Sequence, residues 1–301
     1  MDNITVYVAP PTYQTEVLQE LSKVNRIEQN LIFSSEKKYP CFAEDIWFNP
    51  VIVNFDSIND AAKILREANT HWYLYPLNNV RRSKLIEEKL RRPFKRRIPF
   101  SIPTNYPDTG VFCLLDKNTL LYSTKRWKKI PFGVVEFVED KVNPPNRAYL
   151  KLWEILSLLN KAPHPGENAI DLGASPGGWS YVLAMLDAQV VAVDKAALEP
   201  RLYKNKNISY LNYSAFALNP ESMQHFDWLF SDIACYPERL YELVQRWIES
   251  GKATHLICTI KLQGETDFEM IKKFQSIPNS EVLHLFYNKH EVTFVHPKMS
   301  A

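Results

Sequence analysis

A glycine-rich turn at residues 171–179 is the part of this sequence whose residue types and spacing point most directly to chemistry. It reads Asp-Leu-Gly-Ala-Ser-Pro-Gly-Gly-Trp, between an expected strand at 168–173 and an expected helix at 177–186. Glycine lets the backbone approach a ligand closely where a strand passes into a helix. Asp194 ends the next expected strand, where a carboxylate suits the hydroxyls of a ribose. These residues predict a nucleoside-binding loop.

The spacing of the glycines indicates what kind of nucleoside ligand the loop takes. A pyrophosphate cradle needs the pattern G-x-G-x-x-G, so that N–H groups at the start of a helix face the phosphates. Here Ser175 stands where the second glycine is needed, and Pro176 has no N–H to donate. A ligand without phosphates therefore fits better than a dinucleotide.

The ending Pro-Gly-Gly-Trp makes the loop more specific than a general nucleotide turn. It resembles the S-adenosylmethionine loop of the FtsJ-like 2′-O-ribose RNA methyltransferases. That family carries a Lys-Asp-Lys-Glu catalytic tetrad, which the resemblance places at Lys151, Asp232, Lys261 and Glu291. It implies S-adenosylmethionine as the cofactor and the following cofactor contacts: Asn146, Gly173, Ser175, Pro176, Gly177, Gly178, Trp179, Asp194, Ser214 and Asp232.

Within this family the chain is most similar to the RlmM subgroup, which methylates a cytidine ribose of bacterial large-subunit ribosomal RNA. The similarity covers residues 144–296 and includes the segments LKLWE, GASPGGW, TIKLQ and FYNKHEVT. Where the subgroup has an acid near the third strand, this chain has Ser214. A neutral hydroxyl accepts a weaker hydrogen bond than a carboxylate, which favours a weaker affinity for the cofactor.

The resemblance assigns acceptance of the 2′-hydroxyl proton to Lys261. We expect desolvation and a second cation, Lys151, to lower the pKa of Lys261, with Asp232 and Glu291 orienting the lysines in a coupled set. Each residue also has a plainer interpretation. Lys151 could pair with Glu154 one turn later, Asp232 could cap a helix, and Lys261 and Glu291 could be solvated. Their occurrence together with a cofactor loop favours the catalytic interpretation.

The order of apolar runs predicts two domains, residues 1–142 and 143–301, divided at the Asn-Pro-Pro-Asn segment 143–146. Downstream, strand and helix runs alternate, which predicts a mainly parallel sheet covered on both faces. The runs 281–287 and 291–296 lie close enough together only for an antiparallel hairpin. With the family resemblance, the expected fold is α/β, a Rossmann-like class I methyltransferase domain with a seven-stranded sheet.

The N-terminal half has an α+β pattern, with strands expected at 4–8, 46–55, 73–77, 110–123 and 132–137 and helices at 14–23 and 59–68. Residues 6–10 and 132–134 are similar in placement to the amino-terminal region of the RlmM subgroup, which includes a THUMP RNA-binding domain. In this chain the region is shorter. We therefore expect a shortened, THUMP-like RNA-binding domain.

Basic residues cluster in this half, although 36 Lys and Arg against 34 Asp and Glu give a net charge of only +2. RNA binding must therefore depend on local charge. Residues 81–97 hold nine basic residues and two glutamates, and residues 125–129 form a second cluster. The alternative is a solvated helix face with internal pairing. The expected phosphate contacts are Arg81, Arg82, Arg91, Arg92, Lys95, Arg96 and Arg97.

Composition excludes several classes of protein. With 46% hydrophobic and 23% charged residues, the chain is not mainly disordered. Its four cysteines form no C-x-x-C pair and its seven histidines no pair at metal-ligand spacing, so neither a disulfide framework nor a metal site is expected. The first residues lack a positively charged targeting region, and no apolar run approaches the roughly 20 residues of a membrane span. These features predict a cytoplasmic protein that does not bind membranes.

Together these observations predict S-adenosylmethionine-dependent 2′-O-ribose methylation of RNA. The expected partner is 23S-type ribosomal RNA or a ribosomal precursor particle. Two alternatives remain: a catalytically weak or inactive RNA-binding relative, and a methyltransferase for transfer RNA or a messenger-RNA cap. An inactive relative would have lost at least one member of the tetrad, and a small-molecule methyltransferase would not need the two lysines.

Overall fold

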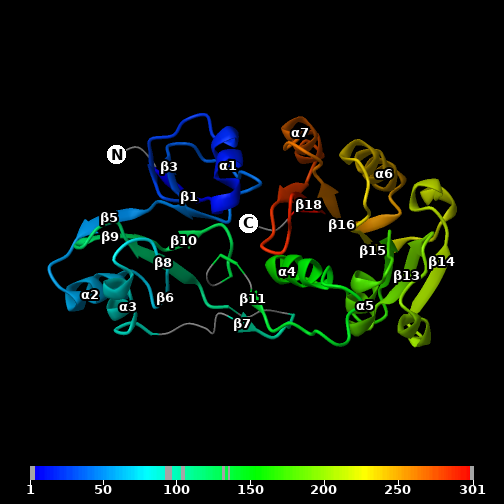
Figure 1. Cartoon of the computed structure of the whole chain (residues 1–301), viewed down its shortest axis with the longest axis horizontal. Helices are drawn as coiled ribbons and strands as arrows, with labels where there is room; N and C mark the ends of the chain where they lie inside the picture. The colour runs from blue at the N-terminus through cyan, green and yellow to red at the C-terminus, as the bar shows by residue number, and fades with distance from the viewer. Residues whose placement is uncertain (1–3, 92–96, 103–105, 131–132, 135, 299–301) are drawn as a thin grey trace. The chain divides into compact units, whose positions relative to one another are not determined.

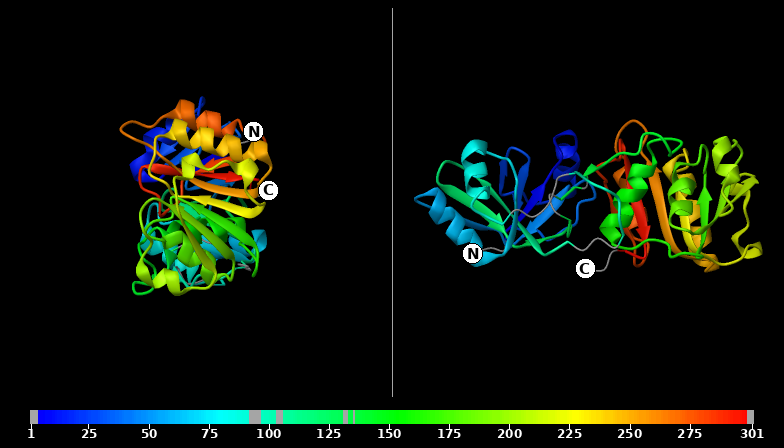
Figure 2. Two further views of the ribbon diagram at one scale, coloured as in Figure 1. Left: turned by 90° about the vertical axis from the view of Figure 1, so that its right-hand side faces the viewer. Right: turned by 90° about the horizontal axis from the view of Figure 1, so that it is seen from below.

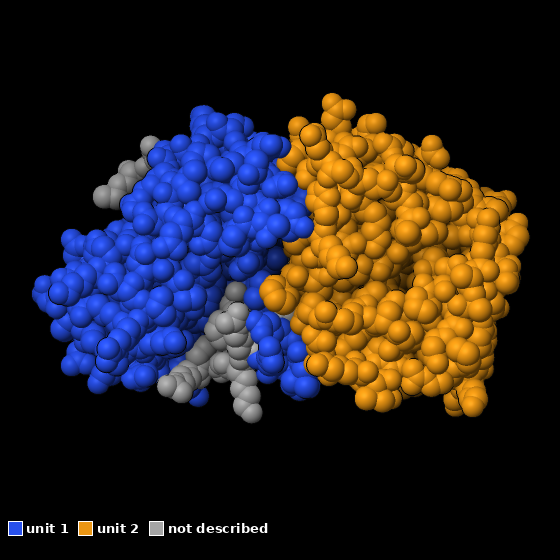
Figure 3. All heavy atoms as spheres, viewed as in Figure 1, with its two compact units in different colours: residues 1–99, 104–138 blue, residues 100–103, 139–301 orange. Residues whose placement is uncertain are grey.

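The computed structural model describes residues 4–91, 97–102, 106–130, 133–134 and 136–298. The chain forms two compact units, shown in two colours in Figure 3. Unit 1 comprises residues 1–99 and 104–138, and unit 2 comprises residues 100–103 and 139–301. Within the described ranges, no helix is long and apolar enough to cross a membrane.

Unit 2 is built on a seven-stranded sheet with the strand order β14-β13-β12-β15-β16-β18-β17. The strands are β12 (Asn168–Leu172), β13 (Gln189–Asp194), β14 (Ile208–Asn212), β15 (Phe226–Ser231), β16 (Ala253–Lys261), β17 (Glu281–Leu283) and β18 (Glu291–His296). Neighbouring strands from β14 to β16 in this order pair in parallel, whereas β18 runs antiparallel to both β16 and β17. The predicted α/β fold, with its antiparallel C-terminal pair, is confirmed.

Helices cover both faces of this sheet (Figures 1 and 2). Helices α4 (Tyr149–Leu159) and α5 (Gly178–Met185) lie on one face, and α6 (Pro237–Ser250) and α7 (Phe268–Gln275) lie on the other. In α6 the buried positions Leu240, Leu243, Val244 and Trp247 recur at helical spacing, so one stripe of the helix packs on the sheet. Short 3-10 helices at Pro200–Lys204, Ala215–Ala217 and Pro220–Ser222 fill connections.

Unit 1 contains two larger sheets. The first, in the order β10-β4-β1-β3-β2, consists of β10 (Lys125–Arg126), β4 (Asp45–Phe48), β1 (Thr5–Val8), β3 (Leu31–Ser34) and β2 (Arg26–Glu28). The second, in the order β5-β9-β8-β6, consists of β5 (Val51–Asn54), β9 (Thr119–Ser123), β8 (Thr109–Leu114) and β6 (His71–Leu74). The helices are α1 (Gln14–Glu20), α2 (Ile58–Ala68), α3 (Val80–Glu87) and a 3-10 turn at Pro11–Tyr13, and the short strands β7 (Arg97–Ile98) and β11 (Glu136–Phe137) pair in parallel.

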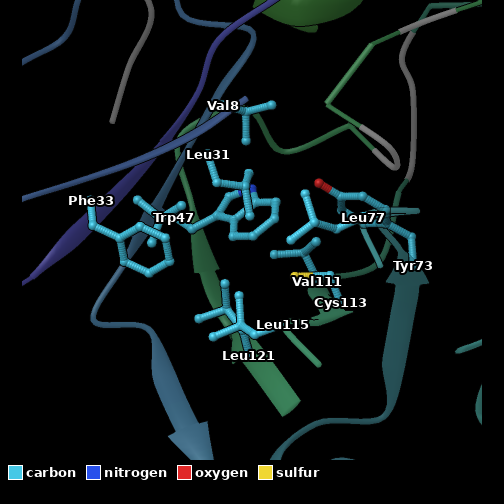
Figure 4. Packing of buried hydrophobic residues seen from close by; sticks show 11 residues of the cluster. Val8, Leu31, Phe33, Trp47, Tyr73, Leu77, Val111, Cys113, Leu115 and Leu121 are labelled. Carbon is cyan, nitrogen blue, oxygen red and sulfur yellow. The ribbon is translucent and has the colours of Figure 1, made fainter. Parts of the chain in front are cut away.

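Strand β8 of the second sheet of unit 1 is buried on both faces. Val111 and Cys113 belong to a core cluster with Trp47 of the first sheet (Figure 4). Phe112 and Leu114, two residues further along β8, belong to a second cluster with residues of α2 and α3. Successive side chains of a strand point to opposite faces, so this sheet separates the two cores.

Two expected strands end earlier than predicted. The run 46–55 is not one strand, because Asn49 adopts a left-handed conformation with φ of 49° and separates β4 from β5, which join different sheets. Strand β17 ends at Leu283 and not at 287, so residues 284–290 form the connection to β18. Of the predicted strand 132–137, the structure describes β11, while residues 132 and 135 lie outside the described ranges.

Candidate active site

The four residues of the predicted tetrad lie at one edge of the unit 2 sheet. Asp232 directly follows β15, and Lys261 is the last residue of β16. Glu291 opens β18 and is the register partner of Lys261, because β18 runs antiparallel to β16. Lys151 lies on α4. The carboxyl ends of parallel strands meet at the same edge, which brings residues far apart in the sequence together.

The four side chains form a closed ring of alternating charge. The ammonium of Lys151 is 2.7 Å from Oδ1 of Asp232 and 3.0 Å from Oε1 of Glu291. The ammonium of Lys261 is 2.6 Å from the same Oδ1 and 2.7 Å from Oε2 of Glu291. Each lysine therefore donates to both carboxylates, and the structure brings together all four residues that the sequence singled out.

Exposure distinguishes the two lysines. The side chain of Lys261 is 24% exposed, against 9% for Lys151. Burial favours the neutral amine and lowers the pKa of Lys261, but the two carboxylates at hydrogen-bonding distance outweigh burial and raise its pKa above the ordinary value. The expectation of a lowered pKa for Lys261 is therefore wrong for the protein without its ligands, since Asp232 and Glu291 both stabilise the ammonium form.

Lys151 pairs with Asp232 and Glu291, and the alternative partner Glu154 has a different role. Its side chain is fully buried in α4, and its two carboxylate oxygens accept hydrogen bonds from the backbone N–H groups of Phe286 (2.9 Å) and Tyr287 (3.0 Å). These bonds hold the connection 284–290 against α4 and draw it out of the sheet after β17. Sequence reasoning did not single out this role for Glu154; the available signal was an acid among apolar residues in YLKLWEILSLL.

The glycines of the loop after β12 are required by close contacts. Gly173 and Gly177 have φ of 79° and 113°, in the left-handed region. A Cβ on Gly173 would lie 2.7 Å from the side chain of Ile233, and one on Gly178 would collide with Oδ1 of Asn146. At these glycines the backbone itself can therefore come close to neighbouring residues and to a ligand.

Asp194 ties this loop to the turn after β13. Its Oδ2 accepts the N–H of Ser175 at 3.0 Å, and its Oδ1 accepts the N–H of Ala196 at 2.8 Å. A carboxylate has about four acceptor positions, so Asp194 retains lone pairs for hydroxyl donors. Ser214 follows the neighbouring strand β14 at the same edge and makes no capping hydrogen bond with its side chain. The carbonyl of Pro176 accepts the N–H of Glu199 at 2.9 Å.

Trp179 packs behind the loop. It is 4% exposed, and its indole N–H donates to the carbonyl of Ala148 at 2.9 Å. Oδ1 of Asn146 in turn accepts the N–H of Ala148 at 3.1 Å. The segment leading into α4 is thus held to the glycine loop, which links the position of the loop to that of Lys151.

A buried acid in the loop motif was not predicted as a functional residue. Asp171 is 1% exposed and accepts the hydroxyl hydrogen bond of Ser180 at 2.6 Å. Burial raises the pKa of Asp171 to about 7, although this bond lowers it, and the negative charges of Asp232 and Asp194 add to the rise. The carboxyl joins β12 to α5 next to the cofactor loop.

The predicted phosphate contacts in unit 1 divide into exposed and packed side chains. Arg81 and Arg91 are exposed. Arg82 lies over the ring of Phe55 at 5.3 Å, and the exposed Arg97 is 3.4 Å from a carboxylate oxygen of Glu136. The remaining predicted contacts lie outside the described residues: Arg92, Lys95 and Arg96.

The second basic cluster, residues 125–129, is in part an internal feature. Arg126 forms an ion pair with Asp45 at 3.0 Å in which the two side chains are 3% and 2% exposed. Lys128 is also buried. The interpretation of these two residues as surface charge is wrong, because Arg126 joins β10 to β4 and β8 through Asp45 and the carbonyl of Thr109. No group of three His, Cys, Asp or Glu residues within the described ranges could hold a metal ion.

The sheet order, the glycine loop after β12 and the carboxylate of Asp194 at the end of β13 define a Rossmann-like class I methyltransferase. Residues 144–301 match the family model described as FtsJ-like methyltransferase. The chain belongs to the FtsJ-like methyltransferase family, and the resemblance seen in its motifs is confirmed.

Two relatives with similar sequences carry the name ribosomal RNA large subunit methyltransferase M. Ribosomal RNA large subunit methyltransferase M of Halorhodospira halophila is 29% identical over 167 residues, which is 53% of this chain and 49% of that protein. The protein of the same name from Xylella fastidiosa is 30% identical over 173 residues, covering 55% and 49% of the two chains. This chain thus matches about half the length of these relatives. Fibrillarin of Aeropyrum pernix with bound S-adenosyl-L-methionine covers 45% of this chain and 68% of its own, with 15% identity and a TM-score of 0.34.

Proposed function

We propose that this protein transfers a methyl group from S-adenosylmethionine to the 2′-hydroxyl of a ribose in RNA, with large-subunit ribosomal RNA as the substrate. The observation that carries the proposal is the ring of Lys151, Asp232, Lys261 and Glu291 at the same sheet edge as the glycine loop. Membership of the FtsJ-like family and the names of the relatives support methyl transfer to ribosomal RNA.

The residues at this edge fit the cofactor. The backbone of residues 173–178 gives close approach, Asp194 offers lone pairs to ribose hydroxyls, and Ser214 offers a neutral hydrogen bond beside the base. When bound, S-adenosylmethionine supplies a methyl group on a sulfonium, an electrophile that needs near in-line approach of a nucleophile. Orientation of the hydroxyl and removal of its proton are then the tasks of the protein.

Lys261 is the member of the ring that we assign to the proton. Its side chain is the most exposed of the four, so a ribose hydroxyl can reach it. Nζ of Lys261 accepts the proton of the 2′-hydroxyl as the oxygen–methyl bond forms and the methyl–sulfur bond of S-adenosylmethionine breaks, which leaves S-adenosylhomocysteine. Lys261 must be neutral to accept it, and its raised pKa opposes this. Because Lys151 donates to the same two carboxylates, a shift of either carboxylate towards Lys151 lowers the pKa of Lys261.

We assign RNA binding to the N-terminal domain, residues 1–142, as a shortened THUMP-like module, and catalysis to residues 143–301. The exposed Arg81 and Arg91 support this role, since cations that face solvent can contact phosphates without leaving an internal partner. The partner in this proposal is 23S-type ribosomal RNA, free or in a precursor particle.

The test is transfer of labelled methyl from S-adenosylmethionine to total RNA from cells that lack the protein. We expect label on a 2′-oxygen, mapped by nuclease digestion, and a loss of about 10²-fold or more in Lys261→Ala. Lys272→Ala, at an exposed position on α7, is the matched control and should retain activity. Label on a base, or full activity in Lys261→Ala, would contradict the proposal.

A further inference from the structure

An aromatic side chain emerges from the connection between β17 and β18, beside the tetrad. The ring of Phe286 is 48% exposed, whereas the preceding residues Leu283, His284 and Leu285 are all buried. Leaving half of a phenylalanine ring in water forgoes part of the favourable free energy of its burial. Single exposed apolar side chains are common on this surface, so the place of this ring in the fold, and not its exposure alone, is what points to a ligand.

Two hydrogen bonds to a buried carboxylate fix the backbone that carries this ring. The N–H groups of Phe286 and Tyr287 both donate to the buried carboxylate of Glu154, at 2.9 and 3.0 Å. Glu154 lies one turn after Lys151 on α4, so the helix that supplies a lysine of the ring also positions this connection (Figure 1). The ring of Phe286 also contacts that of Tyr287 edge to face, at 5.1 Å. The ring of Phe286 is thus exposed while the backbone that carries it is held in place.

The sheet topology places Phe286 at the edge where the tetrad lies. Strand β17 runs antiparallel to β18, which runs antiparallel to β16, so β17 ends at the edge where Lys261 ends β16. Residues 284–290 then lead directly into Glu291, and the carbonyl of His290 accepts the N–H of Leu262 at 3.2 Å. A ribose at Lys261 would therefore have its own base and its neighbouring nucleotides at the same sheet edge as this connection.

We propose that the ring of Phe286 stacks on a nucleobase of the RNA strand and so sets the position of the ribose over the tetrad. Bases of unpaired RNA stack on aromatic side chains, and such contacts tolerate many sequences because every base has a π-face. This inference rests on the proposed function, since it needs RNA as the substrate. Phe286 is a positioning residue, because it touches the base and not the reacting atoms.

The experiment compares methyl transfer to ribosomal RNA by the full-length wild type, Phe286→Ala, Phe286→Trp and Met185→Ala. Met185, on α5, is 49% exposed and matches Phe286 in exposure. We expect Phe286→Ala to raise the KM for RNA roughly 5- to 160-fold, the range of losses for one stacked base. S-adenosylmethionine affinity should stay unchanged, and the rate at saturating RNA should fall because the ribose is no longer held over the tetrad. Phe286→Trp should restore both the KM and the rate, and Met185→Ala should match the wild type.

The outcomes separate this inference from the proposed function. If the wild type methylates RNA and Phe286→Ala has the same KM for RNA, stacking by Phe286 is overturned while the proposed function stands. If Phe286→Ala lowers S-adenosylmethionine affinity and Phe286→Trp does not restore the KM, the ring has only a structural role and the inference is also overturned. If the wild type transfers no methyl group to any RNA, the proposed function fails and the inference fails with it.

Discussion

At the scale of single residues, the pKa of Lys261 connects the ring geometry to a pH dependence. Asp232 and Glu291 raise this pKa, so Lys261 is an ammonium at neutral pH. Below its pKa, the neutral fraction of a lysine grows tenfold for each pH unit. We expect the single-turnover rate of methyl transfer to rise with pH between about 7 and 9 with a logarithmic slope of about 1.

The variant Glu291→Gln tests the cause of that dependence. It removes one of the two negative charges that raise the pKa of Lys261, so the rising part of the profile should move to lower pH even if the maximum rate falls. A wild-type rate that does not change with pH, or a shift to higher pH in Glu291→Gln, would contradict the role given to Lys261.

The buried carboxyl of Asp171 leads us to expect that the free energy of unfolding falls as pH rises. Its pKa is about 7 in the folded protein, against about 3.9 for an exposed aspartate. Between these values the folded state holds a proton that the unfolded state has lost, so this group lowers the free energy of unfolding as pH rises from about 4 to about 7. The accumulated effect is on the order of 4 kcal/mol.

Asp171→Asn cannot ionise and keeps an acceptor for Ser180. Its stability relative to wild type, measured by urea unfolding, should therefore increase with pH across this range and level off above it. Glu249→Gln, an exposed position on α6, is the control and should show no such trend. A constant difference between Asp171→Asn and wild type at all pH values would argue against a buried proton.

At the scale of elements, Gly173 in the glycine loop and Gly166 before β12 offer a matched pair of substitutions. Gly173 and Gly166 have φ of 79° and 85°, so alanine at either position costs about 1–2 kcal/mol for the left-handed backbone. A Cβ meets nothing within 4 Å at Gly166, whereas at Gly173 it would lie 2.7 Å from Ile233, the residue after Asp232. Gly173→Ala should therefore also displace Asp232.

We expect Gly173→Ala to lose roughly 10²-fold in methyl transfer, as for a displacement of about 1 Å at a catalytic group, and Gly166→Ala to keep its activity. Initial rates at saturating cofactor and RNA, together with urea unfolding, separate the two effects. Equal activities at similar stability would show that the contact with Ile233 has no bearing on the site.

The elements also show what a sequence can and cannot predict. Alternation of strands and helices was sufficient for the α/β sheet, because those patterns depend on burial along each segment. The end of β17 depends on the carboxylate of Glu154, far away in the chain, and no local pattern reports such a contact. The turn at Asn49 has a local cause, a left-handed residue before a proline, and the Asn-Pro pair at 49–50 was a turn signal available in the sequence.

At the scale of the whole molecule, the positions of the charged residues could also be predicted only in part from the sequence. The motifs were sufficient to bring the four tetrad residues to one edge, because each has a fixed place relative to a strand or helix. Basic residues have no fixed place relative to a strand or helix. A count of basic residues therefore included Arg126 as surface charge, although it forms a buried ion pair with Asp45. With a net charge of +2, the RNA binding that we propose depends on the basic side chains that remain exposed.

Arg81 and Lys84 on α3 are two such exposed side chains. If they contact phosphates, the double variant Arg81→Gln/Lys84→Gln should lower RNA affinity and reduce the slope of log affinity against log salt by up to about 1.4, or about 0.7 per contact on single strands. Cofactor affinity and the rate at saturating RNA should stay unchanged, because the reacting groups lie in unit 2. The control Lys63→Gln/Lys117→Gln removes two other exposed charges of unit 1. An equal effect in both double variants would mean that overall charge, and not the basic segment, attracts the RNA.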